Sequence, residues 1–465
     1  MNQYLRICIY FLLILALASV CVKYIRIPFK PSEWQLKSPE EVAIVDFDSA
    51  FLTVLTGDTL KLLPPDTIKV TNDTIIARSH LSCPPLFLNQ LAKLHKQLRN
   101  TSQTNRNIRI LHFGDSQIEG DRITAHLREA FQNKYGGSGP GLTTIYDPQR
   151  INPSVWLDSD GDWQIHSIYN RKRQLPNKAY GLMGQTASLK ANSSGTFKIS
   201  PSRWAEKHAS HYQKVRLFIA PHTDSVVIKG TIKATEVINE TLLPSDALTE
   251  INWEFEQLSP RLKFNLSSSA DVHILGCALD STNGVTVDNI ALRGQSSPLL
   301  HRTNGELFKA MCEHLDIGLI IFQFGTNIIP TVAPNYNFYK VQLAKQFDLL
   351  KTFLPDVPIL IIGISDAAQK TNGQIQSYDH LHKIAHAQKA IALEYDFAYF
   401  DLFNAMGGDG SIIEWSRKSP PWALTDYIHL SRKGGQEVAN LLTNALWQHM
   451  SDPVKQDSSL MLTIR

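Results

Sequence analysis

The chain has 465 residues, too many for one small domain. Its 43% hydrophobic and 19% charged residues indicate folding around buried cores. The net charge is only +3, and the first thirty residues carry four basic residues and no acid. The remainder is therefore close to neutral, which argues against nucleic-acid binding. Two of the five cysteines lie in an N-terminal apolar run, and the others lack CxxC or zinc-like spacing, so neither a disulfide scaffold nor a metal site is expected.

Residues 7–22 form an uncharged apolar run between Arg6 and Lys23. A helix of this length spans about 24 Å, short of a ~30 Å hydrocarbon core. Residues 1–30 are therefore expected to be a signal peptide, cleaved after the Ala-Leu-Ala of residues 16–18, or a signal anchor whose flanking cations reach the interface. Cys21 is not expected to be lipidated, because the preceding Val20 is too large. A buried core helix is the third alternative.

Residues 31–83 are rich in Pro, Asp and Thr and contain short alternating stretches, which predict an N-terminal β or extended region. From residue 84 the pattern changes, and residues 84–150 are expected to form the first part of an α/β domain. The expected elements are a helix at 85–99, a buried strand at 108–113, a helix near 121–134 and a glycine-rich loop at 136–141.

Residues 151–275 have a different character. Tryptophan and phenylalanine residues are scattered among Ser, Thr, Asn and Asp, and no long helical period is present. The expected strands lie at 214–220, 225–232, 251–255 and 261–265. The pattern predicts an all-β, sandwich-like insertion.

The α/β alternation resumes over residues 276–452, which leaves 453–465 as a C-terminal tail. Strands are expected at 319–324, 357–364 and 398–402, and helices at 339–353, 378–395 and 434–450. Continuous apolar strands that alternate with helices indicate a three-layer domain with a parallel sheet covered on both faces. The β insertion would split this domain into two parts.

Polar residues suited to acyl transfer follow three of these segments. Ser116 ends Phe-Gly-Asp-Ser, Asn327 ends Phe-Gly-Thr-Asn, and Asp426 and His429 bound Asp-Tyr-Ile-His. Ligands of open parallel sheets bind beyond the carboxyl ends of the strands. Ester chemistry needs a nucleophilic hydroxyl, a base, a group that orients the base, and donors for the oxyanion, and these four residues supply all of them.

Each of the four residues also has a structural alternative. Ser116 could cap a helix, Asn327 could be a turn residue, His429 could be a buried structural histidine, and Asp426 could cap the closing region. The glycine-rich loop lacks the Lys-Ser/Thr of a P-loop, and the histidines show no HExxH spacing, so no cofactor and no metal are expected.

These segments, in this order, resemble the conserved blocks of the SGNH (GDSL-like) hydrolase superfamily. Gly-Asp-Ser116 resembles the block with the nucleophile, Gly-Thr-Asn327 the block with an oxyanion-binding asparagine, and Asp426 with His429 the D-x-x-H block. The resemblance implies a flavodoxin-like fold and an oxyanion hole made by Ser116, Asn327 and a glycine. Gly294 is the best match to that glycine. Its neighbours Arg293 and Gln295 are candidates for substrate binding.

A closer resemblance is to bacterial cell-envelope esterases that remove O-acetyl groups from peptidoglycan, some of which carry a carbohydrate-binding-like β module at the place of this insertion. It implies an extracytoplasmic serine esterase, periplasmic or extracellular, secreted or tethered to the inner membrane, that removes O-acetyl groups from a cell-envelope or dietary polysaccharide. One alternative is a polysaccharide or peptidoglycan O-acetyltransferase that uses the same residues with a membrane acyl-donor partner. Another is an inactive glycan-binding surface protein.

Overall fold

The computed structural model describes residues 76–78, 80–147, 152–170, 174–256 and 261–450. The expected signal peptide or anchor at 1–30 lies outside these residues, as do nearly all of the expected N-terminal region and the tail from 453. Within the described ranges, no helix is both long enough and apolar enough to cross a membrane.

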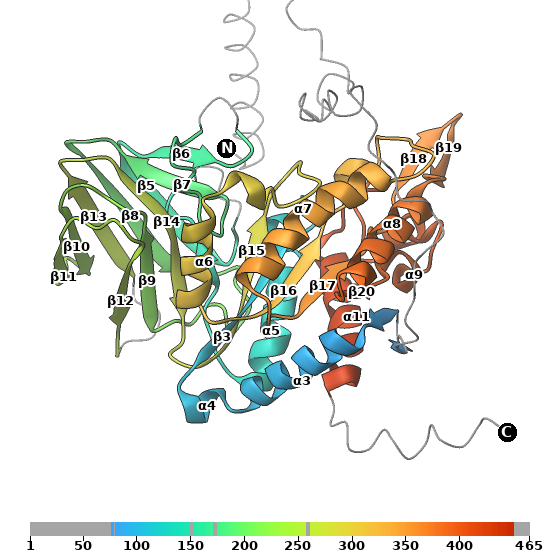
Figure 1. Ribbon diagram of the computed structural model, residues 1–465, viewed down its shortest axis with the longest axis horizontal. Coiled ribbons are helices and arrows are strands. Elements are labelled where there is room, and N and C mark those ends of the chain that lie inside the picture. Colours follow the sequence, from blue (N-terminus) through green and yellow to red (C-terminus); the bar gives the residue numbers. More distant parts are fainter. Residues whose placement is uncertain (1–75, 79, 148–151, 171–173, 257–260, 451–465) are drawn as a thin grey trace, which may run out of the picture. The chain divides into compact units, whose positions relative to one another are not determined.

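A seven-stranded mixed sheet forms the centre of the α/β part (Figure 1). Its strands, in spatial order, are β1 (Ile76–Arg78), β2 (Leu81–Cys83), β20 (Ala398–Phe400), β17 (Ile359–Ile362), β16 (Ile317–Gln323), β3 (Asn107–Gly114) and β15 (Gly284–Ala291). The five strands from β20 to β15 are parallel, whereas β1 and β2 form an antiparallel edge. In chain order the parallel strands give the doubly wound arrangement 2-1-3-4-5 of flavodoxin-like folds.

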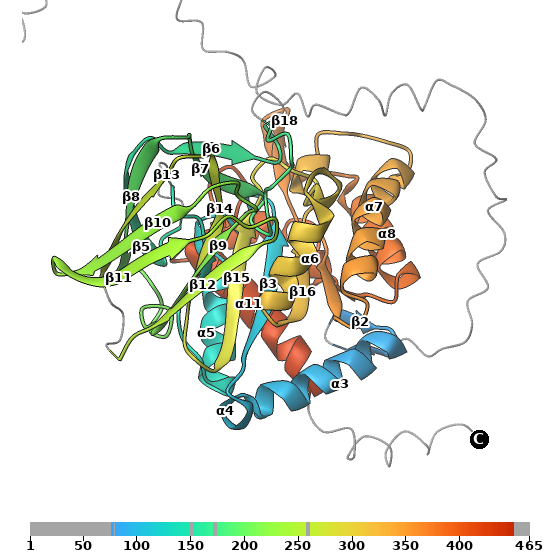
Figure 2. The ribbon, with the colours of Figure 1, turned by 60° about the vertical axis from the view of Figure 1, so that its left-hand side comes forward.

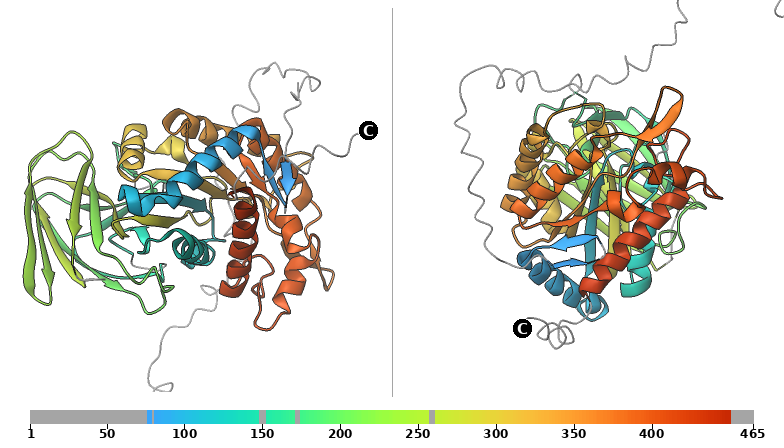
Figure 3. Two further views of the ribbon diagram at one scale, coloured as in Figure 1. Left: turned by 90° about the horizontal axis from the view of Figure 1, so that it is seen from below. Right: turned by 90° about the vertical axis from the view of Figure 1, so that its right-hand side faces the viewer.

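Both faces of the sheet are buried under helices, as Figures 1 and 3 show. On β3, Leu111 and Phe113 belong to one hydrophobic cluster, and Ile108 and Ile110 belong to the other. The first cluster includes side chains of α6 (Gly305–His314), α7 (Asn337–Phe353) and α8 (Leu381–Glu394), and the second includes those of α3 (Pro85–Arg99), α5 (Thr124–Tyr135) and α11 (Arg432–Met450). Such two-sided burial requires the near-continuous apolar strands seen in the sequence.

Several short elements complete the α/β part. They are the helices α4 (Thr101–Thr104), α9 (Leu402–Met406) and α10 (Ser411–Ser416), the 3-10 turns Glu119–Asp121, Leu300–Arg302 and Thr326–Ile328, and the hairpin of β18 (Ala368–Thr371) and β19 (Gln374–Ser377). The hairpin was not expected from the sequence, because its strands are mostly polar and carry no apolar pattern.

Two antiparallel sheets lie beside this domain (Figure 2). One contains β11 (Thr235–Leu242), β10 (Val226–Ile232), β13 (Leu262–Ser268), β8 (Ser193–Pro201) and β5 (Val155–Gly161). The other contains β12 (Thr249–Glu254), β9 (Lys214–Ile219), β14 (Val272–Asp280), β7 (Gln185–Leu189), β6 (Gln164–Ser167) and β4 (Gly141–Thr143). Trp253 of one sheet packs on Phe264 of the other with ring centroids 5.3 Å apart, and one hydrophobic cluster joins both sheets. We call this pair of sheets the β module.

The borders of the two parts differ from those expected. Strand β14 continues to Asp280, beyond the expected end of the insertion at residue 275, and β4 joins the same sheet before the expected start at 151. Strands β1 and β2 add to the α/β sheet, although their residues fall in the expected N-terminal region. Sheet membership follows from pairing with strands far away in the chain, so local composition did not mark these borders.

A buried ion network joins the two parts. The Arg109 guanidinium on β3 contacts Asp280 at the end of β14 and Asp288 on β15, at 2.5 Å each, and Arg216 of β9 donates to Asp280 at 3.1 Å. Burial opposes ionisation of Asp280, but the two guanidinium groups outweigh it and hold the pKa of that carboxyl below its ordinary value. Arg109 therefore compensates carboxylates from both the sheet and the β module.

Removing this guanidinium should destabilise the whole protein. Arg109→Ala leaves the buried Asp288 carboxyl without its paired guanidinium and Asp280 with Arg216 alone, and we expect a loss of about 3–5 kcal/mol in the free energy of unfolding. Arg106→Ala is the matched control: it removes the exposed pair with Asp316 and should cost no more than about 1 kcal/mol. Urea unfolding followed by circular dichroism measures both. Equal losses for the two variants would contradict the role assigned to Arg109.

Candidate active site

The register of the parallel strands brings three loops to one level. Gly114 at the end of β3 pairs with Ala291 of β15 on one side and with Gln323 of β16 on the other. Ser116, Gly294 and Asn327 follow these three strand ends within a few residues. The sheet thus delivers the candidate nucleophile and both candidate oxyanion loops to the same carboxyl edge, the usual ligand site of this topology.

Ser116, His429 and Asp426 form a continuous hydrogen-bonded row. The Ser116 Oγ lies 2.8 Å from His429 Nε2, and His429 Nδ1 lies 2.8 Å from Asp426 Oδ2. Ser116 and His429 are 313 residues apart in the chain. Ser116 provides no cap to either of the helical segments that follow it, so a capping role does not explain its presence. The row has the geometry of a serine nucleophile, a general base and an orienting carboxylate.

Asp426 has two roles in its loop. Its Oδ1 accepts hydrogen bonds from the backbone N–H groups of Ile428 and His429, at 3.0 Å each, while Oδ2 faces the ring. Burial would raise the pKa of this carboxyl, but those N–H donors and the histidine ring outweigh it and lower the pKa below its ordinary value. Asp426 therefore stays ionised at neutral pH. The tight turn places Tyr427 in the left-handed region, with φ of 57°.

The expected oxyanion donors lie on the neighbouring loops. Gly294 has φ of 75°, and a side chain at this position would meet no atom within 4 Å, so its requirement for glycine is conformational. Asn327 lies in the 3-10 turn Thr326–Ile328, and its Nδ2 donates to the backbone carbonyl of Gln295 at 2.9 Å. This bond uses one of the two N–H groups of the amide and ties the Asn327 loop to the Gly294 loop.

The two candidate substrate-binding residues differ in environment. Arg293 has a side chain that is 73% exposed, with its guanidinium 3.4 Å from Glu119. Gln295 is half-buried, and its backbone N–H and carbonyl both participate in the turn. Their assignment to substrate remains a prediction.

Two buried residues beside Ser116 were missed by the sequence analysis. Asp115 accepts the backbone N–H of Gln117 at 2.9 Å and that of Thr326 at 3.2 Å, and burial raises its pKa to about 6. Gln117 contacts the backbone on either side of His429. Both belong to the serine motif in sequence, but Thr326 and the histidine loop, which they contact, lie more than 200 residues away. Only the polar character of two residues in a buried turn could have indicated them.

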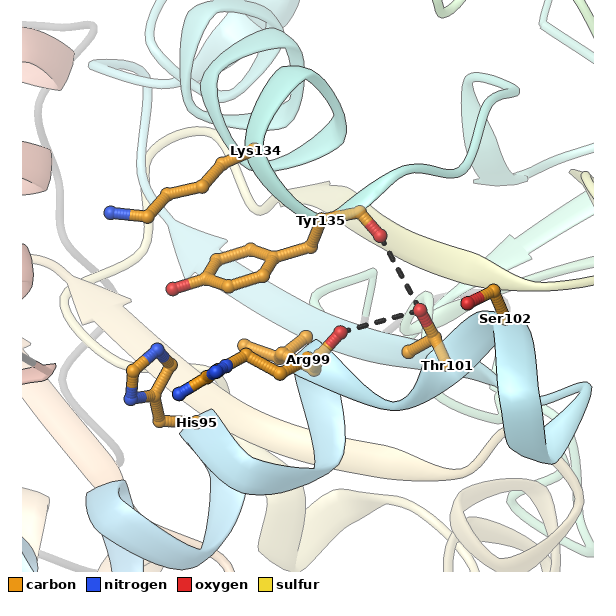
Figure 4. Close-up of a pocket in the computed structure, with 7 residues that line it drawn as sticks. His95, Arg99, Thr101, Ser102, Lys134 and Tyr135 are labelled. Carbon is orange, nitrogen blue, oxygen red and sulfur yellow. Dashed lines mark hydrogen bonds between the residues drawn. The ribbon is translucent and has the colours of Figure 1, made fainter. Parts of the chain in front are cut away.

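A separate cavity of about 390 Å³ lies at the C-terminal ends of α3 and α5. In Figure 4 the side chains of His95, Arg99, Lys134 and Tyr135 all extend to the same side of this cavity. Helix α5 begins near the serine turn. Its twelve residues span about 18 Å, so the cavity at its C-terminal end lies about that far from the start of the helix. Cations at helix C-termini also complement the helix dipoles, which gives these residues a structural role.

Among the described residues, no cluster of three or more His, Cys, Asp or Glu side chains could hold a metal ion.

Comparison with solved structures shows a shared fold. The chain is similar in fold to a peptidoglycan O-acetylesterase. The TM-score is 0.61 and the identity 19%, over 80% of this chain and 99% of that one. No protein-family model and no curated protein sequence matches the chain.

Two other structures have much lower TM-scores. One is a family two carbohydrate esterase of Clostridium thermocellum, with TM-score 0.25, 10% identity, and coverage of 62% of this chain and 98% of that one. The other is a salicylyl-acyltransferase from a tetracycline biosynthetic pathway, with TM-score 0.29, 9% identity, and coverage of 67% and 98%. Such low TM-scores carry no argument about this chain.

The row of three residues predicts graded losses in hydrolysis of an aryl acetate. Ser116→Ala and His429→Ala should each lower kcat by about 10⁶-fold, and the double variant should be little worse, because the two residues act as one unit. Asp426→Asn should cost less, about 10⁴-fold, since it removes orientation and charge but leaves the base. Steady-state kinetics, with circular dichroism as the folding control, tests the series. A folded His429→Ala variant with near-wild-type turnover would refute the assignment of the base.

The amide of Asn327 gives a second kinetic prediction. Asn327→Ala should lower kcat by about 10²–10³-fold with little change in KM, as expected for a donor that acts on the developing oxyanion. The control is Asn440→Ala. Asn440 lies on α11, well past the start of the helix that follows His429, and this variant should leave kcat unchanged. If Asn327→Ala instead raises KM alone, the amide binds the ground state and is not an oxyanion donor.

Proposed function

We propose that the protein is a serine esterase that removes O-acetyl groups from a polysaccharide. The observation that carries this proposal is the row from Ser116 through His429 to Asp426 at the carboxyl edge of a parallel sheet, with hydrogen-bonding distances of 2.8 Å. The fold shared with a peptidoglycan O-acetylesterase supports the same chemistry and suggests an acetylated cell-envelope glycan as substrate.

The reaction would proceed in two steps. His429 Nε2 takes the proton of Ser116 Oγ, which attacks the carbonyl carbon of the acetyl ester, while the backbone N–H groups of Ser116 and Gly294 and the Asn327 amide stabilise the oxyanion. His429 then returns the proton to the leaving sugar oxygen, and the acetyl group remains on Ser116. In the second step His429 activates a water molecule, which releases acetate and restores the serine hydroxyl.

The exposure of the site suits a polymeric substrate and release to water. The side chains of His429 and Asp426 are 29% and 44% exposed, so an acetyl group on a long chain can approach from solvent. Transfer to a second sugar would require exclusion of water from the acyl-enzyme, and an exposed base favours hydrolysis. Acetyl transfer to a glycan, with a membrane acyl-donor partner, is the alternative that the test below separates from hydrolysis.

A loop of the β module adds a surface for sugar. Residues 202–213, between β8 and β9, lie against α5 and α11: Glu206 contacts Arg432 at 2.6 Å, and the backbone N–H of His208 donates to Glu129 at 3.1 Å. Arg432 follows His429 by three residues, and the Trp204 ring on this loop is 62% exposed. The Trp204 carbonyl accepts from Arg432 at 3.5 Å, and the Arg203 guanidinium lies 4.8 Å from the centroid of the Trp204 ring. An exposed indole on this loop is suited to stacking on a sugar ring.

The expected location is outside the cytoplasm, either secreted or tethered by the N-terminal segment. The support is the apolar run at residues 7–22 together with a cell-envelope substrate. Determination of the mature N-terminus by mass spectrometry distinguishes a cleaved signal peptide from a retained anchor.

Acetate release provides the decisive test. The wild-type protein should release acetate from O-acetylated peptidoglycan or acetylated xylan and from an aryl acetate, Ser116→Ala should release none, and a chelator should have no effect. Trp204→Ala should lower kcat/KM on the glycan by about fivefold, since a stacking contact contributes roughly 1 kcal/mol, and should leave hydrolysis of the aryl acetate unchanged.

Three outcomes would oppose the proposal. Acetyl transfer from an activated donor to a glycan, without acetate release, would identify a transferase. Glycan binding that survives Ser116→Ala, with no hydrolysis by the wild type, would identify a binding protein. If Trp204→Ala changed kcat/KM equally on the glycan and on the aryl acetate, Trp204 of the β module would have no specific role in recognising the glycan.

A further inference from the structure

Gln117 connects the serine turn to the histidine loop. It follows Ser116 directly, and its side chain is buried, at 2% exposure. The Nε2 group donates to the backbone carbonyl of Ile428 at 2.6 Å, and the backbone N–H of Leu430 donates to Oε1 at 3.3 Å. One amide group therefore binds the main chain immediately before and immediately after His429.

The histidine loop has few other fixed points near the serine. A bridge between Ala423 and Leu430 closes the loop, and within it the backbone N–H of Leu424 donates to the His429 carbonyl at 2.8 Å. The carbonyl of Tyr427 accepts the backbone N–H of Ala368 at 2.8 Å, which joins the loop to the β18 segment. These bonds hold the loop together and to its neighbour, but none of them reaches Ser116.

The serine turn carries a matching contact on its other side. Asp115 accepts the backbone N–H of Thr326, next to Asn327, at 3.2 Å, and also that of Gln117 at 2.9 Å. The residues before and after Ser116 thus reach in two directions, one to the oxyanion loop and the other to the base loop. A displacement of about 1 Å between reacting groups can cost roughly 10²-fold in rate, so such contacts bear directly on catalysis.

We propose that Gln117 is a positioning residue that sets the distance between Ser116 Oγ and His429 Nε2 by holding the backbone on both sides of the histidine. It does not touch the substrate. This inference rests on the proposed esterase function, because the distance matters only if His429 takes the proton of Ser116.

Gln117→Met removes both hydrogen bonds at nearly constant volume. We expect kcat on an aryl acetate to fall by about 10–100-fold while KM changes less than about twofold, since substrate contacts are untouched. Gln132→Met is the matched control: Gln132 is also buried, at 1% exposure, and donates to the Gly139 carbonyl at the far end of α5. It should retain wild-type kcat even if its thermal midpoint falls as much as that of Gln117→Met.

Gln117→Glu adds a readout that a purely structural role would not give. A protonated Glu can still donate to the Ile428 carbonyl and accept from Leu430, but an ionised Glu places a negative oxygen against that carbonyl. The ratio of variant to wild-type kcat should therefore fall as pH rises through the ionisation of the introduced carboxyl. Gln117→Asn, one methylene shorter, should not restore activity.

The outcomes separate this inference from the proposed function. If folded Gln117→Met keeps wild-type kcat, or if the Gln117→Glu ratio is independent of pH, the positioning role is wrong while an inactive Ser116→Ala still supports the esterase. If the wild type hydrolyses no acetyl ester, both proposals fall. If Gln117→Met does not fold, the pH profile of Gln117→Glu alone decides, with its thermal midpoint followed across the same pH range.

Discussion

The parallel pairing of β3 with β15 and β16 is the constraint on which the site depends. Because Gly114, Ala291 and Gln323 lie in register, the loops that follow them emerge at one level. A Cβ at Gly114 would lie 3.0 Å from the Gln323 carbonyl oxygen and 2.8 Å from the Ile118 side chain, so the close approach of β3 and β16 at this point favours glycine. A one-residue slip of either neighbour would move its loop and reverse the faces of its buried side chains.

The sheet does not position the candidate base, His429, which comes from a loop just before α11. Its place is fixed by polar contacts of other kinds: the Asp426 turn, the bond from Ala368 to Tyr427, and the two bonds of Gln117. The row of Ser116, His429 and Asp426 therefore combines a rigid element, set by strand register, with a loop held by hydrogen bonds. Such bonds are individually modest in stability but geometrically specific, which is what proton transfer requires.

The sequence predicted the elements with strong periodicity and the residues within short motifs. The helix at α3 and the strand at β16 carry unmistakable apolar patterns. The Gly-Asp-Ser and Asp-x-x-His motifs indicated a candidate nucleophile and a candidate base, whose side chains lie 2.8 Å apart in the structure. The partners of Arg109 were beyond reach, because Asp280 and Asp288 lie 171 and 179 residues away. A charged residue in an apolar strand signals a buried partner without identifying it. Strands β14 and β15 lacked a local signal that would assign them to different sheets.

The same buried network bears on how the β module relates to the site. Asp280 ends β14, and the chain enters β15 only a few residues later, so the module is attached to the strand that precedes the Gly294 loop. Its loop at residues 202–213 contacts α5 and α11, the helices that follow the serine turn and the histidine loop. An insertion tied to both candidate catalytic segments and to the strand before the oxyanion loop cannot move far without disturbing all three. Under the proposed function, rigid attachment of this kind favours a module that holds the polysaccharide in a fixed orientation to Ser116 over a module that moves independently of the site.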